Sequence, residues 1–173
     1  MNEQTKETQP IEISIDLTRD DYGDFNRFWF QKKGLKKRLY IVAFMALTFP
    51  FLFNSDHPFH LLNYIFEVAL VAIIFGSIYI GGMYLIVSRT GKYPSENGSI
   101  LGKRTFIITE EGLIEESETN KTLQRWKGIK GVETNKRSVF IFVDNIAAYI
   151  IPKRFFTSEQ EQNAFIKAIK DRL

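Results

Sequence analysis

The longest uninterrupted run of apolar residues lies near the middle of the chain. From Val68 to Val87 there is no charged side chain, and Ile, Val, Leu, Phe, Tyr and Gly dominate. As an α-helix rising about 1.5 Å per residue, this run reaches roughly 30 Å, the thickness of the hydrocarbon core of a bilayer. A helix of this length without a charged face is not typical of a soluble protein. The pattern therefore predicts a transmembrane helix over residues 61–87.

A shorter apolar run, Leu39–Phe53, precedes it. Basic side chains at its start can extend into the headgroup region. Pro50 lies in its last turns, where the loss of a backbone hydrogen bond matters least. We expect spans at 39–53 and 61–87 that form a transmembrane hairpin over residues 39–90. The alternative is one true span preceded by a buried or re-entrant segment.

Basic residues flank the predicted hairpin at both of its ends. The segment QKKGLKKR ends directly before the first span, and Arg89 and Lys92 follow the second. The connecting loop, NSDHPFH, contains neither Lys nor Arg. Because Lys and Arg accumulate in cytoplasmic loops, the sequence predicts that both termini are cytoplasmic.

Outside the apolar runs, alternation of apolar and polar residues predicts β-strands. Ile11–Leu17 alternates strictly, which is typical of a half-buried strand. Ser158 and Glu161 form a predicted capping box that opens an amphipathic helix carrying Phe165, Ile166, Ile169 and Leu173 on one side. Further strands are expected at residues 105–109, 113–118, 122–126, 139–143 and 147–151. Since a single strand is not stable alone, we expect Ile11–Leu17 to join the later strands.

These elements divide the chain into five parts. Residues 1–10 are expected to be a disordered N-terminal tail, and residues 11–38 a cytoplasmic strand followed by an aromatic and basic helix. The hairpin occupies 39–90, a linker 91–99, and a cytoplasmic domain 100–173. The predicted fold class is an α+β membrane protein, with a two-helix transmembrane hairpin and a small antiparallel β-sheet or roll that ends in a C-terminal helix.

Composition narrows the classes of function. The chain has no Cys, which excludes disulfides, thiolate metal sites and Cys nucleophiles, and its net charge of +3 does not favour nucleic-acid binding. It contains no Gly-rich phosphate loop and no GxSxG or HExxH motif. His57 and His60, with Asp56, lack a third strong ligand at fixed spacing. The paired acids Glu110–Glu111 and Glu115–Glu116 are interpreted as solvent-facing. We therefore expect no enzymatic activity, no metal and no cofactor.

A carboxylate lies at the edge of the longer span. On a helix, Glu67 shares one face with His60 and Asn63. Polar and small residues on one face are usual where helices pack together, so Glu67 is expected to face the first span, a sister subunit or external water. The alternative is an ion or proton site, because intramembrane carboxylates are often functional. A second face of small residues is suited to self-association: Ala69, Ala72 and Gly76.

Several motifs together resemble a known family. They are ITEEGLIEE at Ile108–Glu116, RWKGIKGVE at Arg125–Glu133 and IPKRFF at Ile151–Phe156, followed by the terminal helix. The early IDLTRDDYGDF, followed by two apolar runs, also fits. In this order they resemble the YcxB-like protein family. The resemblance implies a protein of the bacterial cytoplasmic (inner) membrane, whose cytosolic part is similar to a pleckstrin-homology-like domain. It carries over no catalytic residues.

The motifs also contain candidate interaction residues. Trp126 is expected mainly to pack at the mouth of the sheet. Lys153 and Arg154 stand beside two phenylalanines at a strand-to-helix corner. This basic and aromatic pairing suits an anionic lipid headgroup or an acidic partner, and the alternative is a solvated corner with the rings packed inward.

The function favoured by these expectations is a membrane-anchored interaction module. The hairpin would tether the domain to the bilayer, and the domain would bind a protein partner or anionic lipid headgroups at the inner face. Homo-oligomers fit this role. The alternatives are a subunit of a small oligomeric transport or ion-responsive membrane protein with Glu67 at its interface, and a membrane immunity or self-protection protein.

Overall fold

The computed structural model describes residues 11–53, 60–95 and 98–173. The predicted tail at 1–10, most of the connecting loop with Asp56 and His57, and residues 96–97 of the predicted linker lie outside the described residues. The chain forms two compact units. The β-unit comprises Met1–Phe25 and Lys92–Leu173, and the helical unit comprises Asn26–Gly91.

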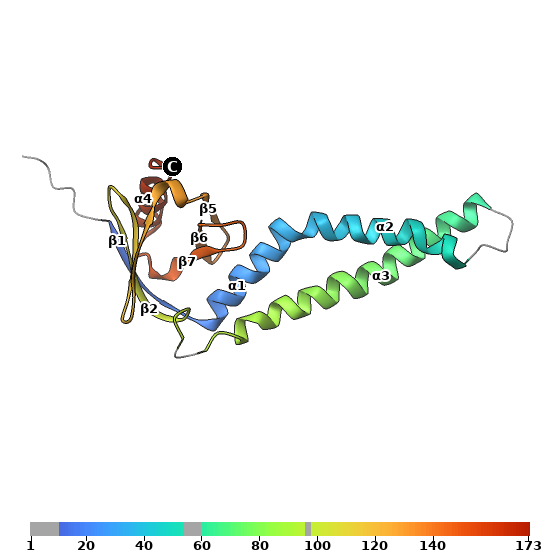
Figure 1. Cartoon of the computed structure of the whole chain (residues 1–173), viewed down its shortest axis with the longest axis horizontal. Helices are drawn as coiled ribbons and strands as arrows, with labels where there is room; N and C mark the ends of the chain where they lie inside the picture. The colour runs from blue at the N-terminus through green and yellow to red at the C-terminus, as the bar shows by residue number, and fades with distance from the viewer. Residues whose placement is uncertain (1–10, 54–59, 96–97) are drawn as a thin grey trace, which may run out of the picture. The chain divides into compact units, whose positions relative to one another are not determined.

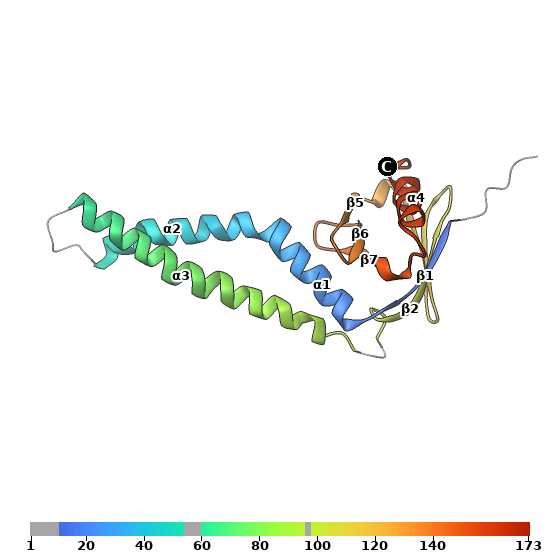
Figure 2. The same cartoon turned by 180° about the vertical axis from the view of Figure 1, so that it is seen from behind.

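The helical unit contains two long helices that run side by side in both views of the chain (Figure 1 and Figure 2). They are α2, Leu35–Phe53, and α3, Leu61–Arg89. Gly76 of α3 is buried against α2, since a Cβ at this position would lie 3.3 Å from Cγ1 of Val42. Gly76 was expected in a self-association face, but it packs within the chain.

Residues Leu61–Lys92 form a helical stretch that is long and apolar enough to cross a membrane, with a mean hydropathy of 2.2 in its most apolar window. In the ranges 11–53, 60–95 and 98–173, no second stretch satisfies the same length and composition. α2 does not, because its first turn carries three cations, Lys36, Lys37 and Arg38. By length and composition, one described helix is able to span a membrane, where the sequence patterns predicted two spans.

A wide helical turn leads into α2. α1, Arg19–Trp29, continues into a π-helical turn, η1, Phe30–Gly34, and then into α2. The guanidinium of Arg38 lies 3.9 Å from the centre of the Phe30 ring. A Cβ on Gly34 would meet Nη1 of Arg38 at 1.8 Å, so glycine leaves the space that this stacking needs.

The β-unit contains two antiparallel sheets. In the first, β1 pairs with β2, with Glu12 opposite Ile107 and Leu17 opposite Gly102. The strand predicted at Ile11–Leu17 and its recruitment to the later strands are therefore confirmed. The order of this sheet is β1-β2-β3-β4, with β1 at Glu12–Leu17, β2 at Gly102–Ile108, β3 at Gly112–Ser117 and β4 at Lys121–Arg125.

The second sheet has the order β5-β6-β7, and the helix α4, Glu159–Lys170, follows it. Pro152 lies opposite Ser138, and the amide of the next residue, Lys153, still donates to the carbonyl of Arg137 at 2.8 Å. The strands are β5 at Gly131–Thr134, which was not predicted, β6 at Ser138–Phe142 and β7 at Ala148–Pro152.

The core of the β-unit is built from both sheets and α4. Its fully buried side chains include Phe106, Leu113, Val139, Ile141, Ile151, Phe165 and Ile169. The predicted capping box is present in part: the hydroxyl of Ser158 accepts from the amide of Glu161, whose carboxylate accepts from the amide and hydroxyl of Thr157. Leu173 was expected on the buried side of α4 but is exposed.

The first half of α1 covers the second sheet. All residues of β6 are buried, which requires cover on both faces of the strand. The Phe25 ring of α1 supplies this cover, with its centre 5.5 Å from that of Phe140 and 6.1 Å from that of Phe142. Phe25 therefore belongs to the core of the β-unit.

Candidate functional site

Arg154, a candidate for contact with a lipid headgroup, is engaged within the β-unit. It lies in a 3₁₀ turn, η4, Lys153–Phe155, directly after β7. Its guanidinium donates to both carboxylate oxygens of Asp21, at 2.5 and 2.8 Å, and to the carbonyl of Asp16 at 3.2 Å. Bidentate pairs of this kind are strong and directional. Arg154 therefore ties the strand-to-helix corner to the start of α1.

Asp21 is held in place for this pair by hydrogen bonds at the start of α1. Its side chain is only 9% exposed, and it accepts hydrogen bonds from the amide and hydroxyl of Thr18 as well as from Arg154. Thr18 in turn accepts from the amide of Asp21, as expected of a helix cap. Burial alone would raise the pKa of Asp21, but the bonds from Arg154 and Thr18 outweigh it and hold the pKa below its usual value.

Trp126 closes a turn of the first sheet. It begins a short 3₁₀ turn, η3, Trp126–Gly128, after β4. Its indole N–H donates to the carbonyl oxygens of Thr109 and Glu110, at 3.2 and 2.9 Å, in the turn between β2 and β3. The guanidinium of Arg172 lies 5.8 Å from the centre of the indole ring. These contacts are structural.

The other two candidates lie apart from this corner. Glu67 is half-buried on α3, in the helical unit. Lys153 is half-buried in η4, next to Arg154, but its backbone contacts the loop between β5 and β6. The four residues singled out from the sequence therefore do not form one site.

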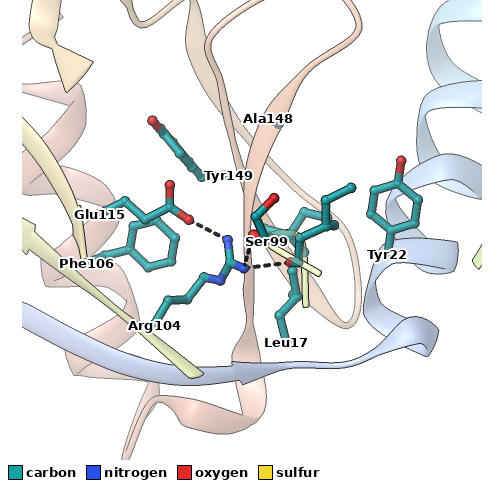
Figure 3. Close-up of a pocket in the computed structure, with 10 residues that line it drawn as sticks. Leu17, Tyr22, Ser99, Arg104, Phe106, Glu115, Ala148 and Tyr149 are labelled. Atoms are coloured by element: carbon teal, nitrogen blue, oxygen red, sulfur yellow. Dashed lines mark hydrogen bonds and ion pairs between the residues drawn. The ribbon is translucent and has the colours of Figure 1, made fainter. Parts of the chain in front are cut away.

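A buried ion pair, not anticipated from the sequence, lines a cavity of about 170 Å³ in the β-unit. Figure 3 shows the guanidinium of Arg104 facing the carboxylate of Glu115, with which it forms a hydrogen-bonded pair. The two side chains are only 10% and 17% exposed. Arg104 also donates to the carbonyls of Ser99 and Ile100, at 3.0 and 2.7 Å, and so holds the chain that enters β2.

Glu115 was interpreted as solvent-facing, and that interpretation is wrong. Phe106 lies opposite Glu115 in the β2–β3 ladder, so Glu115 is on the inner face of the sheet. Arg104, two residues before Phe106, is on the same face and reaches Glu115 diagonally. The period of two in β2 was the available signal, since it aligns Arg104 with the buried Phe106 and Ile108.

Tyr149 of β7 also lines the cavity (Figure 3). Its ring packs edge-on against Phe106, with 5.5 Å between ring centres. Burial, and then the negative charge of Glu115, raise the pKa of the Tyr149 hydroxyl. The cavity thus combines a neutralised ion pair with a protonated phenol. Among the described residues, no group of three or more His, Asp or Glu is placed to hold a metal ion.

The fold that carries these features is an α+β arrangement of two antiparallel sheets and a C-terminal helix. Residues 108–169 match the model of a family described as YcxB-like protein. The C-terminal region of the chain, from the end of β2 into α4, is therefore a YcxB-like domain, as its motifs indicated. The match includes Trp126, Lys153 and Arg154. No curated protein matches the chain.

Proposed function

We propose that this chain is a membrane-anchored interaction module. In this proposal α2 and α3 cross the inner membrane of a bacterium as a hairpin, and the β-unit lies at the cytoplasmic face, where it binds a protein partner or anionic lipid headgroups. The family match gives the domain type, and the proposal adds its location and role.

The pairing of β1 with β2 is the observation that carries the proposal. β1 precedes the helical segments in the sequence and β2 follows them, yet the two strands form one ladder. Because a water-soluble sheet cannot extend through a bilayer, both ends of the helical insertion belong on the same side. A chain that returns to its starting side crosses an even number of times. If α3 crosses, α2 is therefore expected to cross as well.

Side-chain contacts near the ends of the insertion favour the same topology. In the helical unit, the side-chain amide of Asn26 donates to the hydroxyl of Thr90 at 2.7 Å. In the β-unit, the guanidinium of Arg19 donates to the carbonyl of Pro94 at 3.3 Å. Each contact joins the chain before α2 to the chain after α3. The basic residues at these ends favour the cytoplasmic side.

The apolar part of α2, residues 39–53, is shorter than a typical span. Three cations precede it in the same helix, and their long side chains can extend to the headgroups while their stems stay in apolar surroundings. Local thinning of the bilayer accommodates a short span at modest cost. The three cations and the short apolar part that distinguish α2 from α3 are thus compatible with a crossing by α2.

The order of elements supports an interaction role for the β-unit. Apart from the helical insertion between β1 and β2, a four-stranded antiparallel sheet, a three-stranded antiparallel sheet and a C-terminal helix follow one another along the chain. A pleckstrin-homology-like domain, which the family resemblance implies, has this order of elements. We propose no enzymatic activity and no cofactor for this domain.

Photo-crosslinking in native membranes tests the proposed role. A photoreactive residue at exposed positions of the β-unit, Arg125 or Lys136, should give reproducible adducts with a protein or with lipid. The same residue at His60, near the opposite end of the hairpin, serves as the control. The full chain is required, because a fragment beginning at Gly98 would lack β1 and its buried side chains. Recovery of the uncrosslinked chain alone in every sample would contradict the interaction role.

A further inference from the structure

The loop between β5 and β6 is short, fixed and basic. The side-chain oxygen of Asn135 accepts from the amides of Arg137 and Ser138, both at 2.7 Å, which fixes the turn. The side-chain amide of Asn135 donates to the carboxylate of Asp24 at 2.6 Å, so the loop is held against α1. Lys136 and Arg137 in this loop are exposed.

A third cation lies beside the loop. The amide of Lys153 donates to the carbonyl of Arg137, one step beyond the last pair of the β6–β7 ladder. Within the described part of the chain, no ion pair involves the side chains of Lys136, Arg137 or Lys153. Since Asp21 neutralises Arg154, these three residues are the cations that the strand-to-helix corner offers to a ligand. We call them the loop cations.

The covalent connection of the loop to the anchor favours lipid as the ligand. Asp24, which binds Asn135, is followed after fifteen residues by Leu39, the first residue of the apolar run in α2. As a helix this connection rises only about 22 Å. A loop tethered so closely to a bilayer meets lipid phosphates at a far higher local concentration than it meets any soluble anion.

We propose that Lys136, Arg137 and Lys153 bind the headgroups of anionic phospholipids in the membrane that anchors the chain. The proposal rests on the proposed function and specifies its ligand and its site. Each basic residue close to an anionic leaflet strengthens binding by about fivefold. Three together shift the ratio of membrane-bound to detached loop by on the order of 100-fold, and salt weakens the effect.

The absence of native Cys permits a site-specific reporter. Thr134→Cys, at the exposed end of β5, is labelled with an environment-sensitive fluorophore in the full chain. The chain is then reconstituted in nanodiscs of phosphatidylcholine, with or without phosphatidylglycerol. We expect blue-shifted emission, quenched by lipid-borne quenchers, in discs with phosphatidylglycerol, and reversal of both effects in high salt.

Two triple variants with equal changes in net charge distinguish lipid binding at this site from general electrostatic attraction of the chain to the membrane. Lys136→Gln/Arg137→Gln/Lys153→Gln should reduce the ratio of bound to detached loop by on the order of 100-fold. A control on β4 and α4 should leave it within a few-fold: Arg125→Gln/Lys167→Gln/Lys170→Gln, all at exposed positions.

The possible failures are distinguishable. If the chains are retained in the discs but their emission does not depend on phosphatidylglycerol, the proposed lipid site is wrong. The proposed membrane anchoring is not contradicted by that result. Equal losses in both triple variants would also overturn the site, since they indicate non-specific attraction of a basic domain. Chains that do not enter discs of either composition would contradict the proposed function itself.

Discussion

The buried pair of Arg104 and Glu115 allows the energetics of the β-unit to be tested quantitatively. Glu115→Gln leaves the charge of Arg104 in a position where only 10% of the side chain reaches solvent. Removing one partner of a buried ion pair costs about 3–5 kcal/mol. The glutamine oxygen retains one neutral hydrogen bond, so we expect a destabilisation of about 3 kcal/mol.

Replacing the other partner should cost more. Arg104→Met also removes the hydrogen bonds to the carbonyls of Ser99 and Ile100, which contribute about 1 kcal/mol each. We therefore expect a loss of about 4–5 kcal/mol. The double variant Arg104→Met/Glu115→Leu leaves no buried charge. It should be more stable than the sum of the single losses implies, by at least about 2 kcal/mol.

Thermal unfolding of the full chain in detergent measures these losses. The Trp29→Phe background leaves Trp126, in the β-unit, as the single indole reporter. For a unit of about 100 residues, 1 kcal/mol shifts the Tm by about 4 °C, so Glu115→Gln should lower it by about 12 °C.

Glu116→Gln is the matched control. Glu116 pairs with Lys121 at 2.8 Å, but both side chains are well exposed, at 46% and 60%. Such surface pairs contribute less than about 1 kcal/mol. Equal Tm values for Glu115→Gln and Glu116→Gln would show that burial does not strengthen the Arg104–Glu115 pair. Single losses that add fully in the double variant would show that the two side chains are not coupled.

Three further changes have defined outcomes. Arg154→Met should cost about 2 kcal/mol in chemical unfolding, since half-exposed Arg154 donates two charge-assisted bonds to Asp21. Because the pKa of Asp21 is lowered on folding, this stabilisation is complete above its unfolded value near 3.8 and is lost as pH falls through the folded pKa. Gly112→Ala should reduce the Tm by about 8 °C or more, because its Cβ would lie 2.2 Å from the carbonyl oxygen of Gln124. Glu67→Gln should leave membrane retention and crosslinked adducts unchanged, as expected of a tether.

Each of these three predictions has a control variant or a result that would contradict it. Arg154→Lys should recover part of the lost stability but not the two-bond geometry. Gly82→Ala should be harmless, since nothing lies within 4 Å of its Cβ position. An Arg154→Met variant as stable as the parent at neutral pH, or ion-dependent behaviour lost in Glu67→Gln, would contradict the roles assigned to Asp21 and Glu67.

The local pattern of apolar and polar residues was sufficient to predict an element where one of its faces is buried and the other is exposed to solvent. β1 shows this best, since its three buried residues alternate with exposed ones. β5 was missed because Gly131–Thr134 is short and none of its residues is buried, so its alternation is weak. Its first residue, at a φ of +153°, is a glycine and reads as a turn signal.

The partners of the polar side chains could be identified only from the folded structure. Lys153 and Arg154 look equivalent in the sequence, but they differ because Arg154 meets Asp21, 133 residues earlier in the chain. No local pattern identifies a partner at that distance. Glu115 and Glu116 look equally exposed for the same reason. The β2–β3 register determines which of them faces Arg104.

Composition and the proposed topology favour different numbers of membrane spans. Composition alone supports one crossing by α3. In the proposed topology, the β1–β2 pairing favours an even number of crossings, because the chain returns to the side on which it started.

Labelling of single cysteines in intact spheroplasts determines on which side of the membrane each part of the chain lies, and it is specific because the chain has no Cys of its own. Three exposed positions are used: His60→Cys before α3, Ser14→Cys in β1 and Lys170→Cys in α4. With a membrane-impermeant maleimide, we expect His60→Cys to react in intact spheroplasts and the other two to react only after lysis. Reaction of Ser14→Cys and Lys170→Cys on opposite sides of the membrane would contradict the proposed topology.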